Sequence, residues 1–401
     1  MIHTRIILIK SIISIICATI LLSCNETHKT TKDMTINWQK LTSEGITGDL
    51  QKGVSATYSA FLNGKLVVAG GANFPGKLGF EGGSKAYYDV ILALDTTEGK
   101  TWKIVGKLPK ASAYGVSIQT SETAYWIGGE TSSGALTDVY KVSFNNTDSI
   151  QLESFPSLPI TMDNFAGCAL NDLIFVAGGN NNGKPGNGFY CLDTESGSTW
   201  NELKPFPGMP RVQPVLAGIE IDGKQYVYLL GGFFGGNESD KPQMLTDVYR
   251  YSISENSWEK VADQIDEVTQ KPFSLGGATA MPINNRYILC LGGVNYEVFL
   301  NAITAQYDIN FNKTLTAEDK KLQNYNFSKE YMTQPVEYYN FNKECRLFDS
   351  ENNSWKTIDI TSDAARAGAT LVFSKNTFYA IQGELKPGVR TMVSWKGTLK
   401  Y

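Results

Sequence analysis

The chain has 401 residues, a formal net charge of −4 and a hydrophobic fraction of 42%. This is the composition of a folded globular protein, and it excludes a disordered or strongly basic chain. No lysine- or arginine-rich tract is present, so we expect no nucleic-acid partner. The two histidines, His3 and His28, lie near the amino terminus. Histidine-based catalysis and histidine-ligated metals are therefore excluded from the rest of the chain, and we expect no metal site.

The amino terminus differs in composition from the rest of the chain. Arg5 and Lys10 precede an isoleucine- and leucine-rich run that ends in Leu-Leu-Ser-Cys at Cys24, which predicts a secretory signal peptide over 1–23. The run is too short and too interrupted for a membrane span of ~20 apolar residues. Its ending resembles a bacterial lipobox, so we expect Cys24 to carry lipid and residues 24–34 to form a tether. An apolar signal with an incidental cysteine is the alternative.

This interpretation predicts an exported protein, a periplasmic or outer-membrane-tethered lipoprotein of a Gram-negative bacterium. Its only membrane contact is then the amino-terminal lipid. The sequence leaves open whether the protein has protein partners.

One short phrase recurs six times, with a period near the ~50 residues of a kelch repeat. Turns such as Asn63-Gly64 precede it, and a strand and often a tryptophan follow. Each repeat therefore predicts a four-stranded antiparallel sheet. Because such sheets bury both faces only by stacking around an axis, we predict an all-β, six-bladed kelch-type β-propeller. The copies are LVVAGGA from Leu66, AYWIGGE from Ala124, IFVAGGN from Ile174, VYLLGGF from Val227, ILCLGGV from Ile288 and FYAIQGE from Phe378.

The last repeat lacks a fourth, tryptophan-led strand, because the sequence ends at Tyr401. The segment 36–41 around Trp38 matches the pattern of the fourth strand around Trp258. We therefore expect the amino-terminal strand to complete the last blade and close the ring, which removes exposed strand edges. The prediction is one propeller domain over 35–401.

The segment 302–342 interrupts the repeat. It mixes charged residues with many aromatics, as in Tyr338-Tyr339-Asn340-Phe341, which argues against disorder. Long insertions in compact folds are usually functional or disordered. We expect a partly helical flap over one face, with a decorative excursion as the alternative.

Four cysteines lie within the predicted propeller, with no Cys-x-x-Cys spacing, in contexts typical of small core residues. Cys168 and Cys191 belong to one repeat, and the sequence leaves open whether they pair. The other two are Cys290 and Cys345.

Polar residues follow the glycine pairs, at loops that converge on one face of a propeller. A ring of such groups suits a polyhydroxylated ligand, because many hydrogen bonds surround a small pocket. The alternative is that these side chains only satisfy loop backbone. The candidates after the glycine pairs are Asn73, Glu130, Asn180, Asn295 and Glu384, and those at the entries to the inner strands are Tyr114, Arg211, Gln213 and Arg366.

The final repeat replaces the glycine pair with Gln382-Gly383 and continues through Pro387-Gly388, a strong turn signal. The turn is expected to bring Glu384 and Arg390 to one mouth. A carboxylate can take and return a proton, and a guanidinium can bind a carboxylate through two hydrogen bonds. A salt bridge that merely fastens the loop is equally compatible with these residues.

The segment 383–391 resembles the Gly-Glu-x-Lys-Pro-Gly-x-Arg-Thr motif of the bacterial N-acetylneuraminate epimerases, which are kelch-propeller mutarotases. The segments 113–117, 128–131 and 292–295 are also similar to that family. Its chains begin near what is the third repeat here, so the resemblance indicates a cyclically permuted branch. Rotation leaves every blade with the same neighbours in a closed ring.

The resemblance implies a sialic acid mutarotase that interconverts the anomers of N-acetylneuraminate without a cofactor. Glu384 would be the acid and base, and Arg390 would orient the substrate or stabilise its charge. Either Arg390 or Arg211 would hold the sugar carboxylate. The predicted substrate-binding residues are Asn73, Tyr114, Glu130, Arg211, Gln213 and Asn295.

Other functions stay open at this point. A sugar- or protein-binding module without turnover is the first alternative, although that role does not require the Glu384–Arg390 loop. A mutarotase of another sugar acid is a further alternative. A copper oxidase is excluded because the predicted domain has no histidine ligands.

Overall fold

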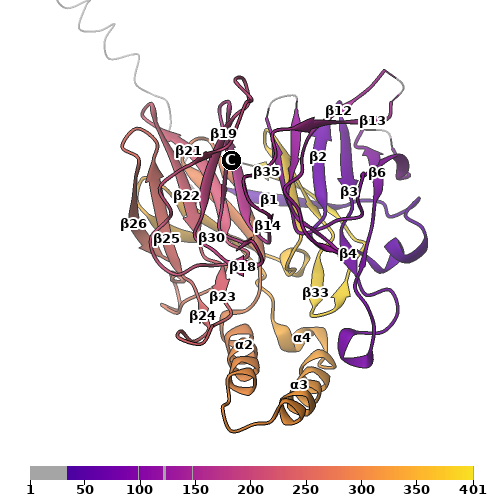
Figure 1. The fold of residues 1–401 in the computed structure, drawn as a ribbon. Helices are drawn as coiled ribbons and strands as arrows, with labels where there is room; N and C mark the ends of the chain where they lie inside the picture. Colours follow the sequence, from indigo (N-terminus) through magenta and orange to yellow (C-terminus); the bar gives the residue numbers. More distant parts are fainter. Residues whose placement is uncertain (1–33, 98, 121–122, 147, 401) are drawn as a thin grey trace, which may run out of the picture.

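A computed structural model describes residues 34–97, 99–120, 123–146 and 148–400. The predicted signal peptide, Cys24 and the tether up to Asp33 lie outside the described residues. Within the described part, no helix is long and apolar enough to span a bilayer. The chain is built mainly from antiparallel strands, which confirms the prediction of an all-β protein (Figure 1).

Six antiparallel four-stranded sheets follow one another along the chain. We number them in chain order and give the strands of each from the inner to the outer edge. Sheet 1 has β2 (Tyr58–Leu62), β3 (Lys65–Ala69), β6 (Val90–Asp95) and β7 (Lys103–Lys107). Sheet 2 has β8 (Val116–Gln119), β9 (Ala124–Ile127), β12 (Val139–Phe144) and β13 (Ile150–Phe155). Sheet 3 has β15 (Ala166–Leu170), β16 (Leu173–Ala177), β19 (Phe189–Asp193) and β20 (Asn201–Glu202).

The second half of the chain repeats this arrangement. Sheet 4 has β21 (Val215–Ile221), β22 (Lys224–Leu230), β25 (Asp247–Ser252) and β26 (Ser257–Asp263). Sheet 5 has β27 (Ala278–Ile283), β28 (Tyr287–Gly292), β29 (Glu344–Asp349) and β30 (Ser354–Ile360). Sheet 6 has β31 (Thr370–Ser374), β32 (Thr377–Ile381), β35 (Trp395–Lys400) and β1 (Thr35–Lys40). The amino-terminal strand thus pairs with the carboxy-terminal strand, from Thr35 opposite Lys400 to Lys40 opposite Trp395.

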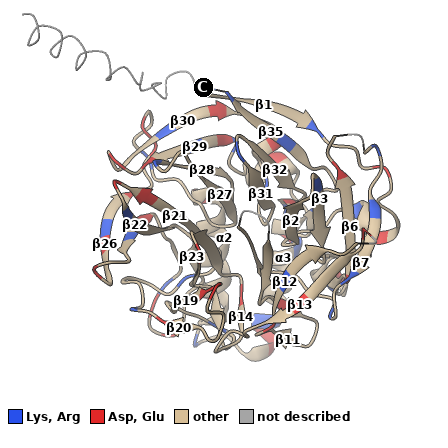
Figure 2. Ribbon diagram, turned by 90° about the horizontal axis from the view of Figure 1, so that it is seen from above, with Lys and Arg blue, Asp and Glu red and all other residues tan. Residues whose placement is uncertain are grey.

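The inner strands contact one another in cyclic order, and β2 also contacts β31. Figure 2 shows the sheets arranged around a central axis. An apolar cluster fills each space between neighbouring sheets. One of them joins Leu66 and Leu92 of sheet 1 to Tyr379 and Ile381 of sheet 6. Both faces of a sheet are therefore buried, which accounts for its nearly continuous apolar strands.

A ring of backbone hydrogen bonds surrounds the axis just before the inner strands. Each member donates its N–H to the carbonyl of the member in the preceding sheet, at 2.7–3.3 Å, and Ala56 completes the circle by donating to Gly368. All members have positive φ, which holds their carbonyls along the ring. The members are Ala56, Tyr114, Asn164, Gln213, Gly277 and Gly368.

Close packing explains the glycine pairs. A Cβ on Gly129 would lie 2.3 Å from the Tyr58 hydroxyl and 2.5 Å from the Ala113 carbonyl oxygen, which no side chain tolerates. In the last repeat Gln382 replaces the first glycine, and its φ of 49° is positive like that of the glycines in the other repeats. Its Oε1 accepts a hydrogen bond from the backbone N–H of Val54 at 2.9 Å. The substitution thus links sheet 6 to the start of sheet 1.

Short hairpins and three helices extend the sheets at one end of the molecule, which we call the mouth face (Figure 1). The hairpins are β4 (Ala72–Asn73) with β5 (Ala86–Tyr87), β10 (Glu130–Thr131) with β11 (Gly134–Ala135), β14 (Met162–Asp163) with β17 (Asn180–Asn181) and β18 (Lys184–Pro185), β23 (Phe233–Phe234) with β24 (Gln243–Met244), and β33 (Glu384–Lys386) with β34 (Val389–Arg390). Short 3-10 turns lie at η2 (Gly48–Lys52), η3 (Gly79–Glu81) and η4 (Ser362–Ala364).

The segment between β28 and β29 is helical, and we call it the helical insertion (residues 296–339). It contains α2 (Tyr296–Asn310), α3 (Ala317–Met332) and α4 (Val336–Tyr339). Its first helix begins at Tyr296 rather than at the predicted boundary of 302, because the side chain of Asn295 caps the helix by accepting from the N–H of Val298 at 3.0 Å.

The register of sheet 3 decides whether Cys168 and Cys191 can pair. Phe175 lies opposite Cys168 on one side and opposite Cys191 on the other. One strand therefore separates the cysteines, which places their Cα atoms about 10 Å apart, beyond the reach of a disulfide. We expect both cysteines to be free thiols in the isolated protein. A digest made without reducing agent tests this, and a peptide pair linked through Cys168 and Cys191 would contradict it.

Candidate functional site

Strand pairing shows which residues share a position around the mouth. The first residue after each glycine pair bridges to the residue before the ring member of its own sheet: Ala113 with Glu130, Asp163 with Asn180, and Ala367 with Glu384. The equivalent positions in sheets 1, 4 and 5 hold Ala72, Phe233 and Val294. Glu130, Asn180 and Glu384 therefore occupy equivalent places, as the sequence predicts.

Asn73 and Asn295 lie one residue further along, so their side chains point to the other side of the chain. Asn73 is buried, and its amide donates to the carbonyl oxygens of Gly53 and Asp49 and accepts from the Tyr88 hydroxyl. Asn295 caps α2. Both side chains are engaged by the protein itself, and this placement argues against the prediction that they bind substrate.

Glu384 and Arg390 face each other across the β33–β34 hairpin, where they are register partners. Arg390 Nη2 lies 2.7 Å from Glu384 Oε1. The turn contributes as well, because the N–H of Gly388 lies 3.3 Å from the same oxygen. The side chain of Glu384 is 25% exposed and that of Arg390 only 4%. The carboxylate therefore faces the mouth while the guanidinium supports it from behind.

The guanidinium of Arg390 is held on three sides. Its Nε donates to Ser55 Oγ at 3.2 Å, and its plane lies 5.2 Å from the centre of the Phe74 ring. Its Nη1 is buried and has no hydrogen-bond partner among the described residues. A buried N–H without a partner is costly, so this atom is a free donor beside the Glu384 carboxylate.

A second carboxylate lies in sheet 2. Glu130 Oε1 accepts a hydrogen bond from the Tyr87 hydroxyl at 2.6 Å and lies 3.4 Å from Lys85 Nζ. The Lys85 ammonium also lies 4.5 Å from the ring centre of Tyr114. Burial, together with the bond to Glu130, raises the pKa of Tyr87 well above its ordinary value. The phenol therefore remains a proton-bearing donor at neutral pH.

A chain of amides leads from this cluster around the ring. Gln213 Nε2 donates to Asn164 Oδ1 at 2.9 Å, and Asn164 and Asn180 both donate to Asp163 Oδ1, at 2.7 and 2.6 Å. Asp163 is buried. Burial raises its pKa, although the two amide bonds oppose that effect. The chain fixes the side chain of Gln213 at the entry to sheet 4.

The sequence reasoning missed Lys85, Tyr87, Asp163 and Asn164. Lys85 directly precedes β5 and Tyr87 ends it, outside the recurring phrase, so their spacing carries no signal. Asp163 and Asn164 occupy the positions of Ala113-Tyr114 and Val212-Gln213 in other repeats. An alignment of the six segments that precede the inner strands could have identified them.

Arg211 and Arg366 are the other two predicted pocket residues. Arg211 is fully buried, pairs with Asp247 through its two Nη nitrogens and donates from Nη1 to the Gly231 carbonyl at 3.1 Å. Arg366 occupies the same place in sheet 6, where its Nη1 donates to the Gln382 and Val393 carbonyls. Burial lowers the pKa of Arg366 to about 10. Both guanidiniums tie strands together, which argues against a role in binding substrate.

A cavity of about 180 Å³ lies on the axis. Tyr114, Asn164 and Gln213 of the backbone ring line it together with residues of the inner strands. Ala367, the bridge partner of Glu384, directly precedes Gly368, which also lines the cavity. The cavity therefore adjoins the backbone ring, and its lining consists largely of small and apolar residues of the inner strands, whereas Glu130 and Glu384 lie outside that lining. Among the described residues, no three Cys, Asp, Glu or His side chains come together as metal ligands.

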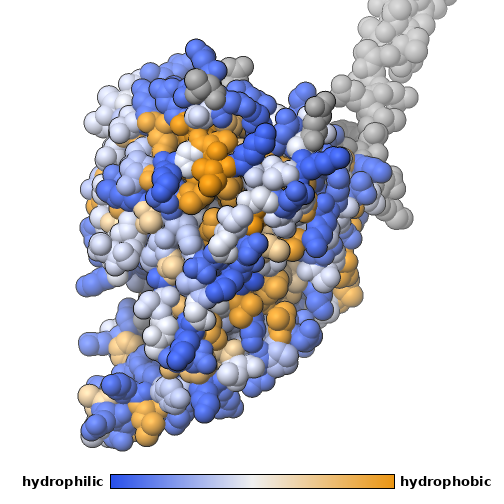
Figure 3. All heavy atoms as spheres, turned by 90° about the vertical axis from the view of Figure 1, so that its right-hand side faces the viewer, coloured by the Kyte–Doolittle hydropathy of each residue, from blue (hydrophilic) through white to orange (hydrophobic). Residues whose placement is uncertain are grey.

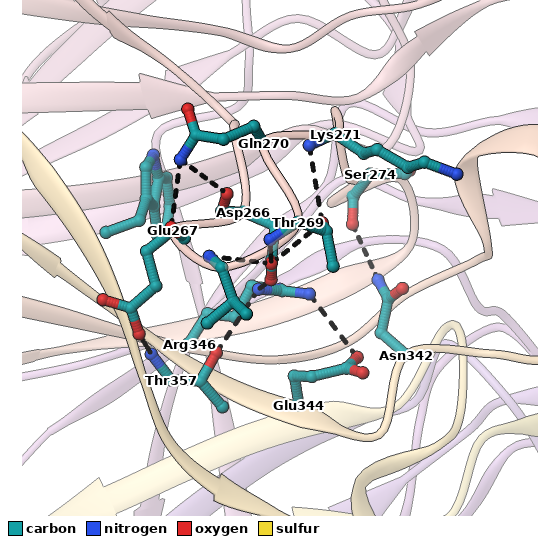
Figure 4. A network of polar contacts seen from close by, with 12 residues as sticks. Asp266, Glu267, Thr269, Gln270, Lys271, Ser274, Asn342, Glu344, Arg346 and Thr357 are labelled. Atoms are coloured by element: carbon teal, nitrogen blue, oxygen red, sulfur yellow. Dashed lines mark hydrogen bonds and ion pairs between the residues drawn. The ribbon is translucent and has the colours of Figure 1, made fainter.

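A polar network joins sheet 5 to the loop around Asp266, near the point where the helical insertion returns to the sheet (Figure 4). Arg346 Nη1 donates to Asp266 Oδ2 at 2.6 Å, and the N–H of Thr269 donates to Asp266 Oδ1 at 2.8 Å. The amide of Asn342 donates to the carbonyls of Ser274 and Gly292. The end of the insertion is therefore anchored to the sheet that carries it.

This network predicts a component of acid sensitivity. Burial alone would raise the pKa of Asp266, but the bonds from Thr269 and Arg346 outweigh it and hold the pKa at about 2, below the ordinary 3.8. The stability from this lowered pKa is present above pH 3.8 and is lost as the pH falls through about 2. The free energy of unfolding, measured with urea, should fall more steeply between pH 4.5 and 2 for the wild type than for Asp266→Asn. Parallel pH profiles would contradict this origin.

Comparison with known protein families decides the relationship. The model of the N-acetylneuraminate epimerase family matches residues 18–150 and 155–401. The chain belongs to the N-acetylneuraminate epimerase family. The resemblance seen in the motif 383–391 is thereby confirmed. N-acetylneuraminate epimerase 1 of Escherichia coli O6:H1 is 32% identical over 223 residues, which cover 55% of this chain and 54% of that protein.

Other members of the N-acetylneuraminate epimerase family show the same partial match. The epimerases of Yersinia enterocolitica and Haemophilus influenzae are each 30% identical, over 61% and 63% of this chain and 57% and 61% of theirs. The chain thus spans a little over half the length of the curated relatives it matches. A solved structure titled "Structure of YjhT" is 27% identical, with a TM-score of 0.49, over 59% of this chain and 62% of that one.

Proposed function

We propose that this protein is a sialic acid mutarotase that interconverts the α and β anomers of N-acetylneuraminate. The observation that carries the proposal is the Glu384–Arg390 pair in the β33–β34 hairpin. It combines a partly exposed carboxylate, a buried guanidinium and an Nη1 with no hydrogen-bond partner among the described residues. Membership of the N-acetylneuraminate epimerase family supports the choice of substrate.

In the proposed reaction Glu384 takes the proton of the anomeric hydroxyl. The bond between the anomeric carbon and the ring oxygen breaks, the anomeric carbon becomes a ketone, and the ring oxygen gains a proton from water or a neighbouring donor. Re-closure on the other face of the ketone reverses these proton movements and gives the other anomer. The reaction moves only protons, so the proposal requires no cofactor. Positioned acid–base catalysis of this kind contributes ~10²- to 10⁴-fold.

Arg390 would hold the sugar carboxylate through its free Nη1, because charge-assisted hydrogen bonds to a guanidinium are strong and directional. Glu130, with Tyr87 and Lys85, would provide hydrogen bonds to hydroxyl groups across the mouth, and Tyr114 and Gln213 would complete the wall at the ring. A small, largely fixed pocket of this kind suits a polyhydroxylated ligand.

We also infer that the six sheets are the blades of a closed kelch-type propeller, a single domain over 35–401. The cyclic contacts of the inner strands, the ring of backbone bonds and the pairing of β1 with β35 support this. A rotated blade order relative to the curated relatives would account for matches that cover only about three fifths of the chain, since a linear comparison cannot cross the point of rotation.

The amino-terminal sequence supports a proposal for location. A signal peptide over 1–23 and a lipid on Cys24 would export the protein and tether it to a membrane of a Gram-negative bacterium through residues 24–34. Radiolabelled palmitate incorporated into wild type but not into Cys24→Ala is the corresponding experiment.

The substrate assignment is tested with a panel of sugars in an NMR assay of anomer exchange. N-acetylneuraminate, a 2-keto-3-deoxy sugar acid and a neutral hexose are compared at one pH. Acceleration confined to N-acetylneuraminate supports the proposal. Acceleration of the other sugar acid alone reassigns the substrate, and line shifts without acceleration would mean a binding module.

A further inference from the structure

The helical insertion crosses from sheet 5 over the mouth face and reaches the hairpin that carries Glu384 and Arg390. α3 contacts η3, and α4 contacts β33. The ring of Tyr325 on α3 lies 6.3 Å from that of Phe80 in η3. In the space-filling view, the projecting lower part of the molecule is largely hydrophilic (Figure 3), and α3 has no buried residue. Tyr331 of α3 packs against the apolar cluster that includes Tyr339 and Phe341, and specific polar contacts add to this packing.

Lys386 supplies the most direct of these contacts. Its Nζ donates to the carbonyl oxygen of Gln334 at 2.6 Å and to that of Met332 at 3.2 Å. Both carbonyls lie at the end of α3, where helix carbonyls lack partners within the helix and the helix dipole favours a cation. The ammonium also lies 6.0 Å from the ring centre of Tyr339. One side chain of the hairpin thus holds both α3 and α4.

Other contacts bring the same end of the insertion close to Glu384. A Cβ on Gly388 would lie 2.5 Å from Leu78 Cδ2 and 3.0 Å from Met332 Cε, so the turn of the hairpin is in close contact with both side chains. Burial raises the pKa of Tyr331, and the neighbouring Tyr339 and Tyr338 and, last, the charge of Glu384 raise it further. The phenol of Tyr331 therefore lies within electrostatic reach of the carboxylate.

We propose that Lys386 is a positioning residue, which fastens the helical insertion to the hairpin so that the end of α3 forms a wall of the pocket beside Glu384. The inference deepens the proposed mutarotase function and rests on it. It assigns a role to the lysine of the motif 383–391, which takes no part in the proposed proton transfer. When the link is lost, the wall undocks and the pocket binds substrate more weakly, while Glu384 and Arg390 keep their pairing.

Lys386→Met tests the proposal, since it keeps most of the apolar stem and removes the ammonium. Loss of a charged hydrogen bond should raise KM for anomer exchange about 10-fold, with kcat changed less than about 3-fold. Lys386→Arg, which retains the charge and donors, should recover most of the affinity. Lys320→Met is the matched control, because Lys320 Nζ donates to the Asn310 carbonyl at 2.7 Å within the insertion and does not bond to the hairpin.

Hydrogen–deuterium exchange of the full chain provides a second readout that is independent of activity. In Lys386→Met, amides of α3 and α4 should exchange faster, while those of β27 and β28 stay unchanged. Normal exchange in the insertion would overturn the positioning role, and a raised KM with normal exchange would instead assign Lys386 to direct substrate contact. If the wild type itself does not accelerate mutarotation, the proposed function fails, and the exchange readout still decides whether Lys386 docks the insertion.

Discussion

Glu384→Gln should abolish the acceleration of N-acetylneuraminate mutarotation, a loss of about 10²-fold or more, and leave the fold intact. Glutamine has nearly the shape of glutamate but cannot take up a proton at neutral pH. Its amide still reaches Arg390 and the turn at Gly388, the two groups that the carboxylate contacts. The rate is measured by proton NMR on freshly prepared α anomer, and the fold by circular dichroism and the unfolding midpoint.

Glu337→Gln is the matched control for this variant, because Glu337 is an exposed carboxylate on α4, outside the hairpin. Its rate should equal that of the wild type. Full activity in Glu384→Gln would remove Glu384 from the mechanism and leave the ion pair as a fastening of the loop.

Arg211→Met should destabilise the protein by about 3–5 kcal/mol, the usual cost of removing one partner of a buried ion pair. The Arg211 side chain is 0% exposed and that of Asp247 is 17% exposed, so the carboxylate would be left largely buried without its cation. The variant should keep the substrate affinity of its folded fraction, because the guanidinium is engaged within the protein. Urea unfolding and KM are measured on the same preparation.

Arg250→Met offers the comparison at an exposed pair. Arg250 pairs with Glu259, whose side chain is 56% exposed, and exposed pairs contribute at most about 1 kcal/mol. A small stability loss in Arg211→Met together with a large rise in KM would restore the sequence-based prediction that Arg211 binds substrate.

The repeat predicted most of the fold, because its signals are local. Short apolar strands and glycine pairs indicate close packing of the sheets, and the tryptophan pattern around Trp38 predicted the strand that pairs with β35. The bridge between Glu384 and Arg390 was predictable for the same reason, since Pro387-Gly388 closes a short hairpin.

The remaining site depended on information that the pattern does not carry. Asn73 and Asn295 lie one residue beyond the position that Glu130 and Glu384 share, and in extended chain one residue reverses the direction of a side chain. The burial of Arg211 and Arg366 was not predictable because a charged residue usually lies at the surface, whereas Asp247 and backbone carbonyls allow it here. Lys85 and Lys386 act across long sequence separations, on Glu130 and on the end of α3, which no single repeat reveals.

The most direct measurement of the central claim is the rate at which freshly released α-N-acetylneuraminate converts to the β anomer, followed by proton NMR with and without the purified protein at one fixed pH. The account predicts a rate that rises in proportion to protein concentration, with the equilibrium ratio of anomers unchanged. A rate equal to that of the protein-free solution at every concentration would contradict it.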